Sequence, residues 1–161
     1  MTSLVSSELR EAVGRMLSRR VSFPVSESDI RRWAVAVYWP EDPPRHFVDV
    51  AYAEATRPQG FVAPAEFNPF AWLVTESEQL GEMPPFTYEY RLNGGVSMSY
   101  GEPMRPGDVI TGVRSLADIS ERAGRRGRML IVVTADRWTN QRGQFVKLHH
   151  FTAIHFVGGD D

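Results

Sequence analysis

The chain has 161 residues, of which 42% are apolar, so it is expected to form one domain (1–161) with a substantial core. Its formal net charge of −2 argues against a nucleic-acid partner, and the absence of cysteine excludes disulfides and thiolate metal sites. Nowhere do about 18 apolar residues run together, and the first residues do not resemble a signal peptide. A cytoplasmic protein without membrane contact is therefore expected.

The first part of the chain carries helical signals. Apolar residues at roughly helical spacing predict an amphipathic helix over residues 1–20. Ser26 or Ser28 can cap a second helix, and Ser26 with Asp29 three residues later resembles a capping box. This second helix is expected to stop at Pro40.

The middle of the chain alternates between a loop and helices. Residues 41–48 contain two consecutive prolines, which predict an ordered overhanging loop, and Asp49 can cap a short helix after it. Residues 67–80 form the most apolar helical candidate. The Asn-Pro pair at its start and the glycine after its end are typical helix boundaries, so this segment is predicted to be a buried central helix.

The last part, 91–157, consists of long segments rich in β-branched and aromatic residues that are joined by glycine-bearing turns. Such segments predict half-buried antiparallel strands. A sheet with one apolar face beside one strongly apolar helix is completed by wrapping around that helix. The predicted fold class is therefore α+β, with a curved antiparallel sheet around the helix at 67–80.

Several motifs, in one order, resemble a known family. The pieces FVAPAEFNPFAW, LNGG, EPMRPGDVI and FTAIHF resemble the MaoC-like dehydratases, specifically the FAS1-like or N-terminal MaoC-like dehydratase domain, over roughly residues 20–157. The resemblance implies a hotdog fold that assembles in pairs through sheet edges. It also implies (R)-specific hydration or dehydration of enoyl thioesters of coenzyme A or acyl carrier protein, without a cofactor.

Catalytically competent relatives carry a loop of the type D-x-N-P-x-H, whose acid and histidine hold the water and move its protons. Alignment on the second proline of EDPPRHFVD places Glu41 and His46 in these roles. Alignment on Asp49, the acid that opens the next helix, instead places Phe47 in the histidine slot. We favour the second alignment, because a helix anchors the backbone more firmly than a loop proline. Glu41 and His46 remain the catalytic candidates.

The resemblance and the apolar pattern also indicate substrate contacts. The candidates are Trp39, Phe47, Phe61, Ala65, Glu66, Phe67, Phe70, Trp72, Asn93, Gly94 and Met98. The amides of residues 65–67 would serve the thioester oxygen if a helix begins there. A metal site is not expected, because His149 and His150 lie on opposite faces of one strand.

The function expected from these observations is an acyl-binding subunit of an (R)-specific hydratase that lacks a complete dyad and pairs with a catalytic MaoC subunit. The alternatives are a self-sufficient hydratase that uses Glu41 and His46, a non-enzymatic acyl-thioester-binding scaffold, and a hotdog thioesterase with Glu66 or Glu76 as its base. A homodimer and a heterodimer both fit the sequence. The acyl chain, and the choice between coenzyme A and acyl carrier protein, remain open.

Overall fold

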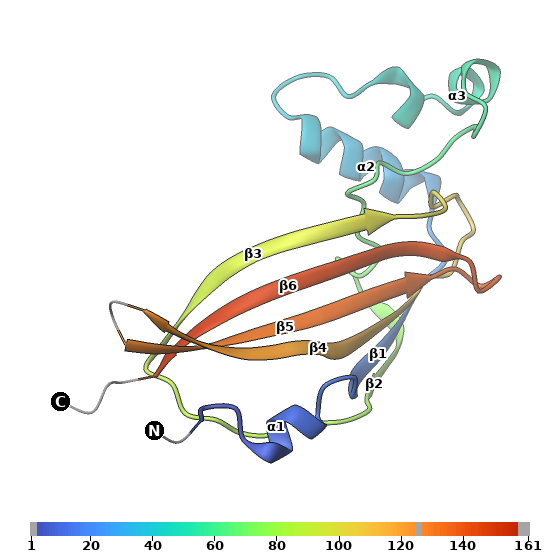
Figure 1. Cartoon of the computed structure of the whole chain (residues 1–161). Coiled ribbons are helices and arrows are strands. Elements are labelled where there is room, and N and C mark those ends of the chain that lie inside the picture. The colour runs from blue at the N-terminus through green and yellow to red at the C-terminus, as the bar shows by residue number, and fades with distance from the viewer. Residues whose placement is uncertain (1–2, 125–126, 158–161) are drawn as a thin grey trace.

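A computed structural model describes residues 3–124 and 127–157 and shows a curved antiparallel sheet of six strands (Figure 1). The strands are β1 (Met16–Ser22), β2 (Val74–Gln79), β3 (Tyr90–Tyr100), β4 (Thr111–Gly124), β5 (Gly127–Thr139) and β6 (Phe145–Val157). They lie in the order β2-β1-β4-β5-β6-β3, so β2 and β3 form the two edges. The predicted antiparallel strands within 91–157 are β3 to β6, and the α+β class is confirmed.

The helices lie at two places on the sheet. They are α1 (Ser7–Glu11), α2 (Glu27–Tyr38), α3 (Val50–Thr56) and the 3-10 helix η1 (Arg45–Phe47). Figure 1 shows α1 beneath the sheet, and α2 and α3 beyond one of its ends. Two predicted caps are confirmed: the Ser26 hydroxyl accepts from the Asp29 amide at 3.0 Å, and Asp49 Oδ1 accepts from the Tyr52 amide at 3.0 Å.

The helix predicted over residues 1–20 is wrong. Within the described residues 3–20 only α1 is helical, and the chain enters β1 at Met16. Gly14, three residues after the end of α1, has a φ of +87°, a turn conformation that residues other than glycine rarely adopt. β1 then pairs with β2 on one side and β4 on the other. This pairing stabilises an extended conformation despite the helical spacing of the apolar residues.

The central helix predicted over residues 67–80 is also wrong. Asn68 Oδ1 accepts from the Phe70 amide at 3.0 Å, so the Asn-Pro pair begins a turn instead of a helix. The chain then forms β2, which pairs antiparallel with β1. Phe67 and Phe70 are buried as expected, but residues 71–80 are mostly exposed. The longest helix among the described residues is α2, which does not occupy the predicted central position.

Two hydrophobic clusters stabilise the fold at opposite places. The first cluster lies between α2, the irregular segment 61–70, the C-terminal end of β5 and the N-terminal end of β6. Its buried members include Ile30, Phe61, Phe67, Phe70, Met104, Ile110, Trp138 and Val146. The second lies between α1 and the sheet and includes Leu9, Leu116, Leu130 and Val132. Phe67 is 1% exposed and meets Trp33 of α2 edge-on, with ring centroids 5.6 Å apart. This ring therefore ties α2 to the segment that enters the sheet.

Lys147 on β6 is buried beside the first cluster. It is 4% exposed, and its Nζ donates to the Phe67 carbonyl oxygen at 3.2 Å. Nζ also lies 4.6 Å from the centroid of the Trp138 ring. Burial lowers the pKa of this amine to about 8, although the charge of Glu66 acts in the opposite direction.

We predict that Phe67→Ala lowers the free energy of unfolding by about 3 to 5 kcal/mol, because it leaves a cavity where two elements meet. Urea denaturation of the purified chain measures the change. Leu73→Ala is the matched control, since Leu73 is 84% exposed and should shift stability by no more than about 0.5 kcal/mol. Equal effects of the two substitutions would contradict the packing described for Phe67.

A second prediction follows from the buried amine. Between pH 8 and about 10.5 the folded amine is largely neutral while the unfolded amine still holds its proton, so unfolding takes up a proton and stability rises with pH. Over this window the wild type should gain up to about 3 kcal/mol relative to Lys147→Met. Urea denaturation of both proteins across this pH range tests it. A stability difference that does not change with pH would show that Lys147 titrates normally.

Candidate functional site

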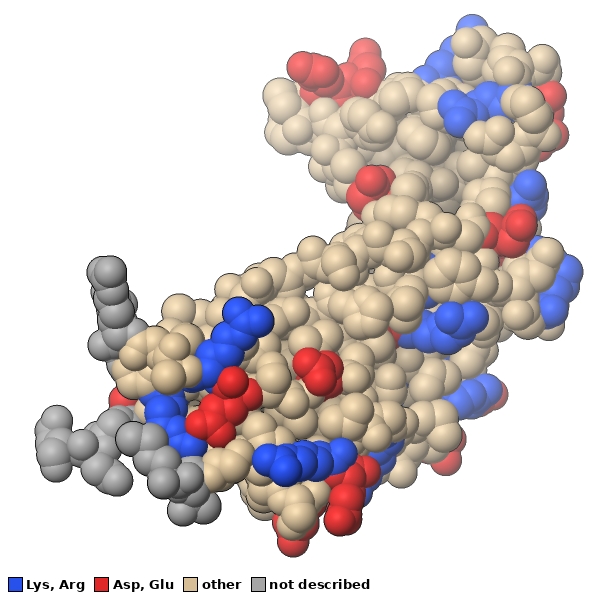
Figure 2. All heavy atoms as spheres, in the orientation of Figure 1, with Lys and Arg blue, Asp and Glu red and all other residues tan. Residues whose placement is uncertain are grey.

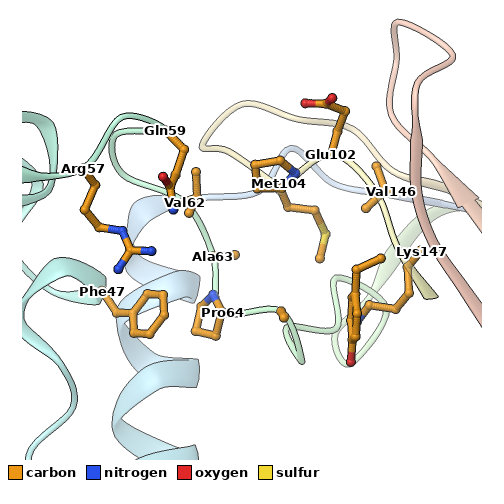
Figure 3. A pocket seen from close by; sticks show the side chains of 14 residues that line it. Phe47, Arg57, Gln59, Val62, Ala63, Pro64, Glu102, Met104, Val146 and Lys147 are labelled. Atoms are coloured by element: carbon orange, nitrogen blue, oxygen red, sulfur yellow. The ribbon is translucent and has the colours of Figure 1, made fainter. Parts of the chain in front are cut away.

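A cavity of about 280 Å³ lies between the helical segment and the near end of the sheet. Figure 3 shows Phe47 and Arg57 on one side of it and Lys147 on the other, with Pro64 and Met104 between them. The lining residues are Phe47, Arg57, Gln59, Val62, Ala63, Pro64, Ala65, Tyr100, Gly101, Glu102, Pro103, Met104, Val146 and Lys147. The walls are mostly apolar, with a few polar groups at opposite sides, as in many ligand sites.

The overhanging loop contributes Phe47 to this cavity. η1 holds the ring in place, and the loop is fastened to α2 because Arg31 Nε donates to the Val48 carbonyl oxygen at 2.9 Å. The loop is also closed onto α3, since Arg45 Nη2 pairs with Asp49 Oδ2 at 2.8 Å. Asp49 therefore both caps α3 and fixes the end of the loop. This is the anchor on which the preferred sequence alignment depends.

Glu41 and His46 are not brought together. Glu41 is exposed, and no hydrogen bond or ion pair joins its side chain to any other described residue. The His46 ring is half-buried against Phe47, with centroids 4.1 Å apart, and neither Glu41 nor His46 lines the cavity. Burial, and secondarily the charge of Arg57, lower the pKa of His46, so its imidazole is neutral at pH 7.

Ala65 and Glu66 lie in a turn instead of a helix. The Phe67 amide donates to the Pro64 carbonyl oxygen at 2.9 Å and closes this turn. The expected helix N-terminus at residues 65–67 is therefore absent. The amides of Ala65 and Glu66 make no hydrogen bond to any other described residue, and Ala65 lines the cavity. Two free backbone donors thus remain at the place where helix donors were predicted.

The other apolar candidates are distributed around the first cluster. Phe67 and Trp72 line a second hollow of about 320 Å³ beside Phe23 and Leu73. Phe61 is buried, and its amide donates to Glu54 Oε1 at 2.9 Å. Phe70 is also buried, with the Arg20 guanidinium 4.7 Å from its ring centroid. Trp39 is 77% exposed beyond the end of α2.

Asn93, Gly94 and Met98 lie on the edge strand β3 and do not line the cavity. The pairing of β3 with β6 shifts between Asn93 and Gly95, so the strand forms a bulge at Gly94. A Cβ on Gly94 would come within 2.9 Å of the Ile154 and Thr152 side chains, which explains the need for glycine. These residues shape the sheet edge.

Sequence reasoning did not select Lys147 as a site residue. The available signal was its identity, because it is the only lysine among 18 basic residues. Among the described residues, no group of three or more histidine, aspartate or glutamate side chains could hold a metal ion. None of the helices in the described ranges is long and apolar enough to cross a membrane.

Comparison with solved structures shows the same fold in several dehydratases and hydratases. A chain of the ChsH1–ChsH2 complex from Mycobacterium tuberculosis is 16% identical, with a TM-score of 0.67 and coverage of 96% of this chain and 94% of that chain. A MaoC-like dehydratase from Rhodospirillum rubrum is 17% identical, with a TM-score of 0.60 and coverage of 94% and 98%. The HadBC (3R-hydroxyacyl-ACP dehydratase) complex from Mycobacterium tuberculosis contains a chain that is 18% identical, with a TM-score of 0.57 and coverage of 87% and 96%.

These similarities confirm the hotdog fold that the sequence resemblance implied. A search of curated proteins found no significant match. The sequence profile of the family described as "FAS1-like, dehydratase domain region" matches residues 11–149. Since this match spans most of the sequence, the chain belongs to the FAS1-like dehydratase family of MaoC-like, hotdog-fold dehydratases and hydratases.

Proposed function

We propose that this chain is the acyl-binding subunit of an (R)-specific enoyl-thioester hydratase, and that a second MaoC-like chain supplies the acid and the base. The observation that carries the proposal is Phe47. It is the residue of the overhanging loop that lines the cavity, where competent relatives place a histidine. Hydration needs a group that removes a proton from water and a group that protonates the α-carbon. A phenyl ring does neither, and it supplies an apolar wall for an acyl chain.

The same cavity offers a position for the thioester oxygen. Negative charge develops on this oxygen in the transition state, and backbone N–H groups stabilise it. Ala65, whose amide is free, lines the cavity, and the free amide of Glu66 follows it in the same turn. They are assigned this role here in place of the helix N-terminus expected from the sequence. The chain would then hold the acyl group and its carbonyl while the partner moves protons.

The two edge strands differ in a way that favours β3 as the edge where a partner binds. The short edge strand β2 carries exposed Glu76 and Glu78, and charged side chains discourage strand addition. By contrast, β3 is eleven residues long and exposes large apolar side chains, namely Tyr90, Leu92, Val96, Met98 and Tyr100. Most of this edge is uncharged in Figure 2. Structural neighbours occur in the ChsH1–ChsH2 and HadBC complexes, which fits a heterodimer better than a monomer.

The thioesterase alternative loses its structural basis. It required Glu66 or Glu76 on a central helix, and neither residue lies on a helix. Glu66 is in the turn described above, while Glu76 on β2 pairs with Arg19 at 2.7 Å. The self-sufficient hydratase and the non-enzymatic scaffold remain as outcomes that the following experiment distinguishes.

The test is hydration of crotonyl-CoA and of a longer enoyl-CoA by the purified chain, alone and together with any MaoC-like protein encoded beside its gene. No hydration is expected from the chain alone, whereas the pair should be active. Activity of the chain alone that falls about 100-fold or more in His46→Ala would instead establish the self-sufficient hydratase. Thioester binding without turnover by the pair would indicate a scaffold, and release of free CoA from a saturated acyl-CoA would indicate a thioesterase.

A matched pair of loop variants tests the wall assigned to Phe47. In the active pair, Phe47→Ala should raise KM for the longer enoyl-CoA roughly 10-fold, because it removes apolar contact with the acyl chain. His46→Ala should change kcat and KM by less than about threefold, since His46 does not line the cavity and acts through no proton transfer. Steady-state kinetics of both variants provides the measurement. The reverse order of effects would reject the assignment.

Charge substitutions on the two edge strands test whether a partner binds at β3. Val96→Lys on β3 should weaken association of the chain with itself or its partner about 10-fold or more, because a lysine on an edge strand opposes strand addition. Glu78→Lys on β2 is the matched control and should leave association unchanged. Sedimentation velocity over a concentration series measures both. Weakening by Glu78→Lys alone would place the interface at the opposite edge.

A further inference from the structure

Lys147 is an unusual group to find at the wall of an apolar cavity. Arginine provides every other basic side chain of the sequence, and arginine cannot lose its charge when it is buried. Lys147 lies on β6, with its Nζ over the aromatic rings of Tyr100 and Trp138. Lys147 lines the cavity, and its amine bonds to the residue that follows the turn at Ala65 and Glu66.

The amine is incompletely compensated. An ammonium group has three donors, and the hydrogen bond that Nζ makes within the described chain is the one to the Phe67 carbonyl oxygen. The Trp138 and Tyr100 rings, with centroids 4.6 and 5.4 Å from Nζ, provide additional cation–π attraction. No described carboxylate lies within ion-pair distance of Nζ. A buried charge without an ionic partner is destabilising, so a ligand anion at this place would be strongly favoured.

The charged groups of the cavity favour the same kind of ligand. Arg57 lies opposite Lys147, and Glu102 is an exposed acid near the rim (Figure 3). Glu66, the acid whose charge acts on Lys147, is also exposed to solvent. The cavity lining therefore presents one buried and one half-buried cation, whereas both acids are exposed. Between the cations, Phe47, Met104 and Val146 offer an apolar path for a carbon chain.

We propose that the cavity binds an acyl group that carries a carboxylate, and that the Lys147 ammonium donates a charge-assisted hydrogen bond to that carboxylate. The inference rests on the proposed acyl-binding function and defines its substrate class as a dicarboxylic acyl thioester instead of a plain alkyl one. A carboxylate occupies the free donors of Nζ and replaces the lost hydration of the ammonium. A plain hydrocarbon chain contacts the same walls but leaves the charge unpaired and removes its remaining water.

The test uses two CoA thioesters of equal chain length, hexanoyl-CoA and adipoyl-CoA, which differ by the terminal carboxylate. Calorimetric titration of the wild-type chain should show tighter binding of adipoyl-CoA. Lys147→Met should weaken adipoyl-CoA binding by about 30-fold or more and change hexanoyl-CoA binding by less than about threefold. Arg137→Met is the matched control, because it removes a cation elsewhere on the sheet, and it should leave both affinities unchanged.

A second measurement needs no variant. Because Lys147 is the sole lysine, reductive methylation with formaldehyde and a borohydride produces one ε-amine adduct that mass spectrometry identifies unambiguously. Adipoyl-CoA should slow this reaction at least about fivefold more than hexanoyl-CoA, since the paired ammonium holds its proton more tightly. The α-amine of the chain is the internal reference. This labelling experiment uses the wild-type chain, so it tests the contact even if Lys147→Met is unstable.

The outcomes separate this inference from the proposed function. If Lys147→Met weakens both thioesters equally, or neither, and labelling is slowed equally by both, the carboxylate contact is rejected while acyl-thioester binding stands. If neither thioester binds, adipate and hexanoate are titrated as free acids. Lys147-dependent binding of adipate alone would then support the carboxylate site and reject the thioester function, and no binding of either acid would reject both.

Discussion

The position of Phe67 is the constraint on which the rest of the structure depends. Its ring is buried against Trp33 of α2, and its carbonyl oxygen accepts from the amine of Lys147 on β6. One residue of an irregular segment thereby connects the helical part to the sheet through its side chain and its backbone at once. The cavity at Phe47 and the second hollow beside Leu73 lie next to this connection. Both hollows take their shape from it.

The parts of the fold that local chemistry determines could be predicted from the sequence. Ser26 and Asp49 cap their helices through hydrogen bonds to amides three residues onward, and such contacts leave clear signals. The strands of the second half also form where β-branched and aromatic residues are concentrated. The segment 74–79 was misjudged because its conformation is set by a ladder with β1, more than fifty residues earlier in the chain. Pairing over that distance has no local signature.

The candidate site was predictable only in part. Phe47 and Ala65 were selected from the family pattern, and the structure places both at one cavity. Residues such as Trp39 and Met98 have the same apolar character but lie elsewhere, because residue type does not state which face of an element a side chain occupies. Lys147 was missed for the opposite reason. A lysine is usually exposed, and only the tertiary structure shows that aromatic rings and the Phe67 backbone cover this one.

The bulge at Gly94 limits how another strand can be added to β3. An extra residue interrupts the regular spacing of backbone donors and acceptors, so the outer edge is divided at this point into two ladders that are out of phase. The uninterrupted ladder on the far side of the bulge is Gly95 to Tyr100, which ends at the wall of the cavity. An incoming strand must choose one phase, because a slip of one residue reverses every side chain. The glycine that local packing requires at this position would therefore also fix the register of any strand added to β3.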